Sequence, residues 1–182
     1  NSTYTLPKLL WLRRRQPETL ERVAAILWPK DYLRYRLTGE LCTDLTEAGG
    51  AALLDWERRE WALERLELVG LRPAVLPPIR PAEADAGRLT PASASALGLN
   101  PAARVLVGMG DVAALFGGAP ARPGRVVCSL GSSSMVFAPL PPGRMVHDPA
   151  GRLYVYPFGP YPMLGGVSST TGAALVWAYA VS

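Results

Sequence analysis

An aspartate that follows a Gly-Met-Gly segment is the residue of this chain best suited to acid–base chemistry. Asp111 ends a predicted strand and precedes VAALFGG, a short apolar helical pattern. A carboxylate at this place meets the positive end of the helix dipole and stays ionised. Loops that leave a sheet at such a point project into clefts. From the residues alone two roles stay open: a base toward a substrate hydroxyl, and a side-chain cap of the helix, which the pattern favours.

A serine-rich turn further along the chain could bind phosphate. Gly131, Ser132, Ser133 and Ser134 lie between the strand patterns RVVCSL and MVFAPL. Glycine permits close backbone approach, and amides and serine hydroxyls can donate to phosphate oxygens. An ordinary polar hairpin turn has the same composition. The hydroxyl residues 168–171 are interpreted as N-caps of the last helix, because they directly precede it.

These residues need elements that position them. PKDYLRYRLTGE predicts a helix that begins at Pro29 and stops at Gly39. Its spacing suggests a structural block with the aromatic side chains inward, Asp31 in the first turn, and Arg34 outward or paired. PKLLWLRRR and PETLERVAAIL are expected to form two helices, or one helix followed by a short strand. Helical patterns are also expected on both sides of a bend at Gly49-Gly50, the second ending at Gly70, and at SASALGL.

From residue 125 onward the pattern changes to strands separated by turns, closing in a helix from about Thr171. Residues 72–91 are rich in proline and alanine, which predicts a surface connection. We place the domain boundary after residue 118, giving domains 1–118 and 119–182. Because the chain starts before one helix and stops in another, we expect it to be an internal fragment.

Composition narrows the function classes. The chain is 49% hydrophobic and 19% charged, which is typical of a globular protein. Its net charge of +4 comes without a lysine-rich stripe or an RNA-binding motif, so we expect no nucleic-acid partner. Cys42, Cys128 and the single histidine, His147, have no metal-site spacing, and no run is long enough to span a membrane. A cytoplasmic enzyme without a metal-ligand set is the natural expectation.

Four blocks in this order resemble the FGGY carbohydrate kinase family. PKDYLRYRLTGELCTDLTEA is similar to a block of the family's first domain, VLVGMGDVAALFGG to "GGGDNAAAALG", and GRVVCSLGSSSMVF to "GDVSVSLGTSGVVF". LGGVSSTTGAALVW is a weaker match to a later glycine-bearing helix. The first block is most like the xylulose kinase branch, while gluconate, ribulose and glycerol kinases share the scaffold.

The resemblance implies an α/β fold of the ribonuclease H-like, actin/hexokinase ATPase type. The chain would hold the later half of the first, sugar-binding domain and the opening of the second, ATP-binding domain. The family's N-terminal "DxGTT" hairpin and its C-terminal adenine-binding region are not among the residues. Sugar and ATP would meet in the cleft between the two domains.

The resemblance also assigns chemistry. It implies phosphorylation of a sugar hydroxyl by ATP with Mg²⁺, most closely D-xylulose to D-xylulose 5-phosphate. Asp111 would be the catalytic base and touch the sugar, and Gly131, Ser132 and Ser133 would contact the ATP phosphates. Val112 stands where the family commonly has a sugar-binding asparagine, and an isopropyl group cannot hydrogen-bond a hydroxyl.

Because of Val112, another kinase of the family, acting on a different polyol or on a sugar acid, is an alternative hypothesis. A non-catalytic module of a truncated gene is a third hypothesis, since the "DxGTT" segment is not seen. An incomplete domain would expose apolar sheet surface, so we also expect the chain to form homo-oligomers.

Overall fold

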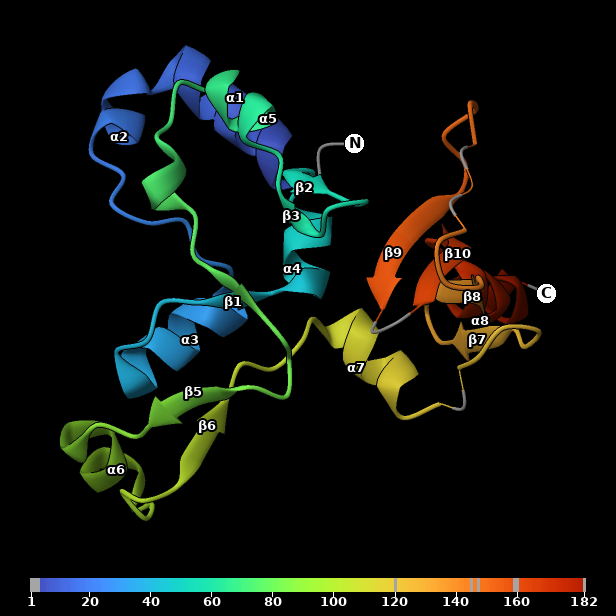
Figure 1. Ribbon diagram of the computed structural model, residues 1–182. Helices are drawn as coiled ribbons and strands as arrows, with labels where there is room; N and C mark the ends of the chain where they lie inside the picture. The colour runs from blue at the N-terminus through green and yellow to red at the C-terminus, as the bar shows by residue number, and fades with distance from the viewer. Residues whose placement is uncertain (1–3, 120, 145, 147, 159–160, 182) are drawn as a thin grey trace. The chain divides into compact units, whose positions relative to one another are not determined.

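The computed structural model describes residues 4–119, 121–144, 146, 148–158 and 161–181, so His147 lies outside the described residues. By their contacts the residues form two compact units, Asn1–Gly110 and Asp111–Ser182 (Figure 1). Helices and strands alternate through both units, which confirms the α/β class. None of the helices in these ranges combines the length and the apolar character needed to cross a bilayer.

The helices of the first unit follow local signals in the sequence. Proline occupies the first turn of several, where its missing N–H costs nothing. The helix α3 ends as predicted at Gly39, which has a left-handed φ of +81°. The helices are α1 (Thr5–Arg15), α2 (Pro17–Glu21), α3 (Pro29–Thr38), α4 (Leu45–Gly50), α5 (Leu63–Glu67), the 3₁₀ turn η1 (Pro73–Val75) and α6 (Pro91–Leu97).

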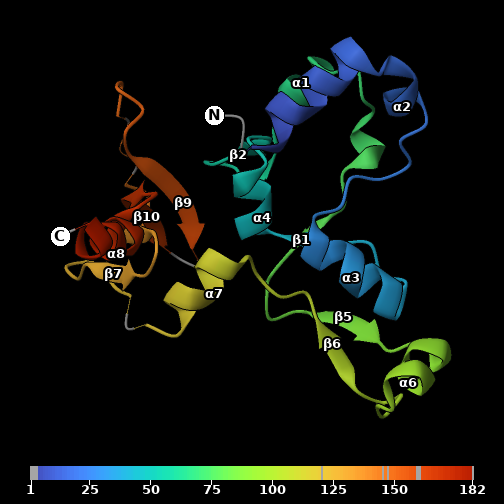
Figure 2. The ribbon, with the colours of Figure 1, turned by 180° about the vertical axis from the view of Figure 1, so that it is seen from behind.

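The strands of the first unit form three short pairs. One pair is parallel and joins β1 to β4 across more than thirty residues, and the other two are antiparallel: β2/β3 is a hairpin, whereas α6 lies between β5 and β6 in the chain. In both views of the ribbon α3 lies alongside β5 (Figures 1 and 2). The pairs are β1 (Thr43–Asp44) with β4 (Ile79–Arg80), β2 (Leu54–Asp55) with β3 (Glu60–Trp61), and β5 (Asp85–Arg88) with β6 (Arg104–Leu106).

The main core of the first unit joins helices to the proline-rich connection. Trp28 stacks on Trp61 at the edge of this core, with ring centroids 5.9 Å apart. Val75 and Leu76 of the connection are buried in the core, so residues 72–91 do not simply cross the surface as predicted. The buried members of the cluster are Leu9, Leu20, Ala51, Leu53, Leu66, Val69, Leu71, Val75 and Leu76.

The second unit is an antiparallel sheet with one helix packed on it. The strand order is β7-β8-β10-β9, and α7 contributes Phe116, which meets the Phe137 ring edge-on at 5.2 Å between centroids. Met163 completes this core. The elements are α7 (Asp111–Gly117), β7 (Val127–Leu130), β8 (Ser134–Pro139), β9 (Tyr154–Phe158), β10 (Tyr161–Ser168) and α8 (Thr171–Val181).

One expectation about elements holds only in part and another was wrong. Of the two alternatives for residues 7–27, two helices are observed, α1 and α2, but α2 ends at Glu21 and the chain runs without helix from there to Trp28. The long helix expected between the Gly49-Gly50 bend and residue 70 is instead the β2/β3 hairpin followed by the short α5. Asp55 explains the hairpin locally, because its carboxylate accepts hydrogen bonds from the amides of Glu57 and Arg58 and so forms a turn.

Contacts group α7 with the sheet that follows it, whereas the sequence analysis placed the boundary after residue 118. Val112 and Phe116 of α7 pack against side chains of β7 and β8. Compact units of contacts need not coincide with the domains of a family. The assignment of domains 1–118 and 119–182 therefore stays a prediction.

Candidate active site

Asp111 is the first residue of α7, and its side chain is exposed. One carboxylate oxygen, Oδ1, accepts a hydrogen bond from the amide of Val112 at 2.7 Å. Among the described residues the carboxylate takes part in no ion pair. It does not accept from the second or third amide beyond it, which is the usual geometry of a helix cap. The carboxylate thus keeps lone pairs available to a ligand.

The segment before Asp111 is held by several backbone bonds. The Val107 amide donates to Ala84 O at 3.0 Å, and the Gly108 amide donates to Ala82 O at 2.9 Å. Gly108 has a φ of +74°, where a side chain would be strained. The amide of Gly110 donates to Oγ1 of Thr46 at 2.8 Å. This segment is therefore fixed from both sides up to the residue before Asp111.

A buried cluster of charges supports the same segment. Asp31 and Asp44 are almost fully buried and face the cations Lys30 and Arg34. The Lys30 Nζ lies 2.6 Å from Asp31 Oδ1 and 2.9 Å from Asp44 Oδ1, so it bridges the two carboxylates. Two positive and two negative groups give the cluster no net charge, which buried charges require.

Arg34 connects this cluster to the strand that leads to Asp111. Its Nη1 donates to Asp31 Oδ1 at 2.9 Å and to Val107 O at 2.7 Å, and its Nη2 donates to Cys42 O. The pairing of Arg34 was one of the two outcomes expected from the sequence. The orientation expected for the helix was wrong, because Asp31 and Arg34 are the buried residues of α3 while Tyr32 is 51% exposed.

Lys30, Asp44 and Thr46 were missed as a supporting group by the sequence analysis. Asp44 also caps α4 by accepting from the amide of Thr46 at 2.8 Å. The sequence does carry a signal, since PKDYLRYRLTGELCTDLT sets several charged and hydroxyl residues among buried positions. That these side chains meet Gly110 depends on a contact across 64 residues, which spacing does not predict.

The predicted phosphate-binding turn joins β7 to β8. Gly131, Ser132 and Ser133 are exposed, and the amide of Gly131 donates to Ser133 O at 2.9 Å. The first turn of α8 closes on it, since the Gly172 and Ala173 amides donate to the carbonyls of Gly131 and Ser132. The carbonyls are thus occupied, while the serine hydroxyls lie on an exposed turn and could donate to an anion.

Val112 contributes to packing. It is partly buried against the cluster of Phe116, Phe137 and Met163. The structure places Asp111, Val112 and the serine turn in one unit, with α7 packed on the sheet that carries the turn. The sugar and phosphate contacts expected of these residues stay predictions.

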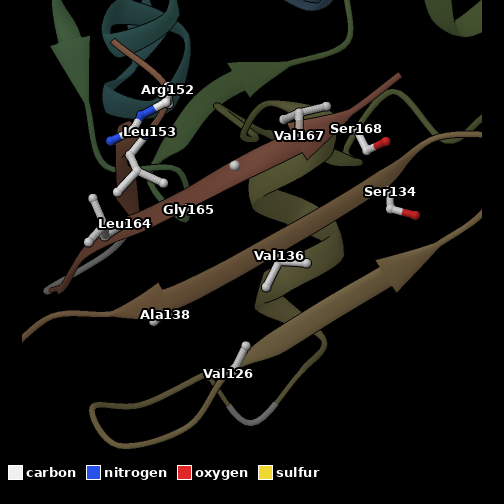
Figure 3. Close-up of a pocket in the computed structure, with 11 residues that line it drawn as sticks. Val126, Ser134, Val136, Ala138, Arg152, Leu153, Leu164, Gly165, Val167 and Ser168 are labelled. Atoms are coloured by element: carbon white, nitrogen blue, oxygen red, sulfur yellow. The ribbon is translucent and has the colours of Figure 1, made fainter. Parts of the chain in front are cut away.

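An open hollow of about 480 Å³ lies on the sheet of the second unit (Figure 3). Val136 and Ala138 of β8 point into it, so it lies on the face opposite Phe137 and α7. Ser134 lines one end, and its buried hydroxyl has no hydrogen-bond partner among the described residues. None of the described residues that line the hollow carries a carboxylate, so these residues offer no base for proton transfer.

Comparison with known proteins gives a consistent result. Residues 1–117 match the model of the FGGY family of carbohydrate kinases, N-terminal domain. A xylulose kinase of Klebsiella pneumoniae is 38% identical over 135 residues, which are 74% of this chain and 28% of that protein. A xylulose kinase of Bacillus subtilis is 31% identical over 136 residues, again 74% of this chain and 27% of that protein. The chain thus spans less than a third of these curated relatives.

Solved structures agree with the fold. A xyloylose kinase from Brucella ovis superposes with a TM-score of 0.86 at 31% identity, covering 97% of this chain and 37% of that one. A ligand-bound xylulose kinase from Lactobacillus acidophilus gives a TM-score of 0.91 at 23% identity, covering 98% and 36%. The expected sugar-kinase fold is confirmed.

Proposed function

Because this chain belongs to the FGGY family of carbohydrate kinases, we propose that it supplies the base and part of the phosphate site for ATP-dependent phosphorylation of a sugar hydroxyl. The observation that carries the proposal is the exposed Asp111 carboxylate, placed at the start of α7 by a braced glycine segment. We take D-xylulose as the first substrate, since curated relatives of this chain are xylulose kinases.

The chemistry follows from the charge and position of these groups. Asp111 accepts the proton of the sugar hydroxyl as its oxygen bonds to the γ-phosphorus of ATP. The bond from that phosphorus to the β,γ-bridging oxygen breaks, and ADP leaves with the electron pair. The Ser132 and Ser133 hydroxyls donate to phosphate oxygens, where negative charge must be offset during transfer.

Magnesium enters this proposal only with the nucleotide. Among the described residues no three His, Cys, Asp or Glu side chains gather into a metal-binding group. Mg²⁺ in kinases is held largely by phosphates, with one or two carboxylates and water. The ion would therefore come with ATP, and none of the residues named above is assigned to hold it.

Asp111→Asn tests the proposal with little change in shape. We expect sugar phosphorylation to fall by about 10²- to 10⁴-fold, the usual contribution of a positioned acid–base group. The assay couples ADP release to a panel of ketoses, polyols and sugar acids. It uses the chain as given and the chain extended to the ends of its gene.

Glu57→Gln is the matched control, since it also replaces an exposed carboxylate by an amide but lies in the β2/β3 turn. It should leave turnover unchanged.

Full activity of Asp111→Asn would refute its role as the base. Absence of turnover from every form and every sugar would refute the kinase proposal and favour a non-catalytic module. A sugar acid or another polyol as the best substrate would favour another branch of the family. That outcome would agree with the replacement of the family's asparagine by Val112.

A further inference from the structure

The placement of Asp111 depends on the residues before it, because its own carboxylate bonds only to the next amide among the described contacts. The nearest anchor in the chain is the amide of Gly110. This amide has no backbone acceptor among the described residues and is held instead by the hydroxyl of Thr46. A backbone N–H bonded to a side chain is a point at which one substitution can release a loop.

Thr46 is itself held in one orientation. The residue is 6% exposed, its amide donates to Asp44 Oδ2 at 2.8 Å, and its hydroxyl donates to the same oxygen. Asp44 is in turn fixed by Lys30 at 2.9 Å. A hydroxyl has one proton, so donation to Asp44 leaves its lone pairs for the Gly110 amide. The contacts therefore converge on Asp44, from Gly110 through Thr46 on one side and from Lys30 on the other.

We propose that Thr46 is a positioning residue, whose hydroxyl holds the Gly110 amide and thereby sets the place of the Asp111 carboxylate. The inference about turnover rests on the proposed kinase function, whereas the hold on Gly110 can be measured without it. Misplacement of a catalytic group by about 1 Å can cost two orders of magnitude in rate. Thr46 touches neither sugar nor ATP in this proposal.

Three variants separate positioning from general loosening of the fold. Thr46→Val keeps the shape and removes the hydroxyl, and Thr46→Ser restores the hydroxyl. Thr43→Val is the matched control, because Thr43 is fully buried nearby in the sequence and its Oγ1 has no hydrogen-bond partner among the described residues. Hydrogen exchange of the Gly110 amide and steady-state kinetics are measured on each variant of the chain extended to its gene ends.

We expect Thr46→Val to raise the exchange rate of the Gly110 amide about tenfold or more, since its acceptor is lost. We expect kcat to fall about ten- to a hundredfold with little change in the KM for ATP. Thr46→Ser should restore both values, and Thr43→Val should change neither.

The proposal is overturned if Thr46→Val leaves Gly110 protected, if protection is lost while kcat stays unchanged, or if Thr43→Val has the same effects. Failure of the proposed function is distinct from these outcomes. It would show as absence of turnover in the unmodified protein. The hydrogen exchange rate of the Gly110 amide would then be the one test of whether Thr46 holds this amide.

Discussion

At the scale of single residues, the first unit contains a buried group of charged side chains. Asp31, Arg34 and Asp44 are at most 3% exposed, and Lys30 reaches the two carboxylates from a position that is partly exposed. A hydrophobic set of the same volume would often be as stable. Arg34 donates to the carbonyl of Val107 in the segment before Asp111, a directed bond that an apolar side chain could not make.

Asp85 offers a residue-scale prediction about pH. The amide of Gly87, 2.8 Å from Oδ1, and the guanidinium of Arg104, 2.8 Å from Oδ2, lower the pKa of this exposed carboxyl. Because the folded state lowers the pKa, the ionised group stabilises the β5/β6 pair above the unfolded pKa. That contribution is lost as pH falls through the folded pKa, below the ordinary value of about 3.9.

An NMR titration of the Gly87 amide measures this pKa directly. We expect a midpoint below about 3.9, and Asp85→Asn should abolish the transition. A midpoint at or above the ordinary value would contradict the assigned contacts.

At the scale of elements, the contact between α8 and the serine turn depends on Gly172. A Cβ on Gly172 would lie 2.4 Å from the carbonyl oxygen of Gly131, whose bond to the Gly172 amide is 3.0 Å long. No side chain fits at that distance. The turn and the first residues of α8 thus behave as one structural piece.

Gly172→Ala should break the contact between the serine turn and the start of α8. We expect it to destabilise the second unit by about 1–3 kcal/mol, the usual cost of overpacking, as a lower midpoint in chemical denaturation. Gly166→Ala is the control, since a Cβ there would meet its nearest neighbour at an ordinary 3.9 Å. Equal midpoints for the two variants would show that the turn shifts without cost.

Elements with local signals were predictable from the sequence. The helix α3 has proline at its start and Gly39 after its end, and β7, β8, β9 and β10 follow the expected strand patterns. The strand pair β1/β4 was not predictable, because strands of two residues have no periodicity and their pairing is set by distant contacts. In the site, the residues next to Asp111 in the sequence were enough to predict that it starts a helix. The hydrogen bond from Gly110 to Thr46 could be found only in the folded structure.

At the scale of the whole molecule, the second unit leaves much apolar surface uncovered. The helix α8 has no buried residue among those described, and Leu175, Val176 and Trp177 are each at least 67% exposed. The hollow over the sheet separately exposes Val136 and Val167. Exposed apolar area of this kind favours association.

We predict that the chain as given self-associates through α8 and that its sedimentation coefficient rises with concentration. Trp177→Glu should shift it toward monomer by placing a charge on that helix. Leu33→Glu, at a 61% exposed position of α3, should leave the distribution unchanged. A single monomeric species at high concentration, without any substitution, would contradict this prediction.

The bracing of the segment 107–110 also bears on how chimaeric kinases could be assembled from relatives. Its anchors come from Arg34, Thr46, Ala82 and Ala84, which are scattered over fifty residues of chain. A crossover placed anywhere between residues 34 and 107 would pair the segment with anchors from another parent. A crossover between Gly110 and Asp111 keeps every anchor with its own segment and also keeps α7 with its sheet. Recombination at that peptide bond is thus the exchange that this chain should tolerate best.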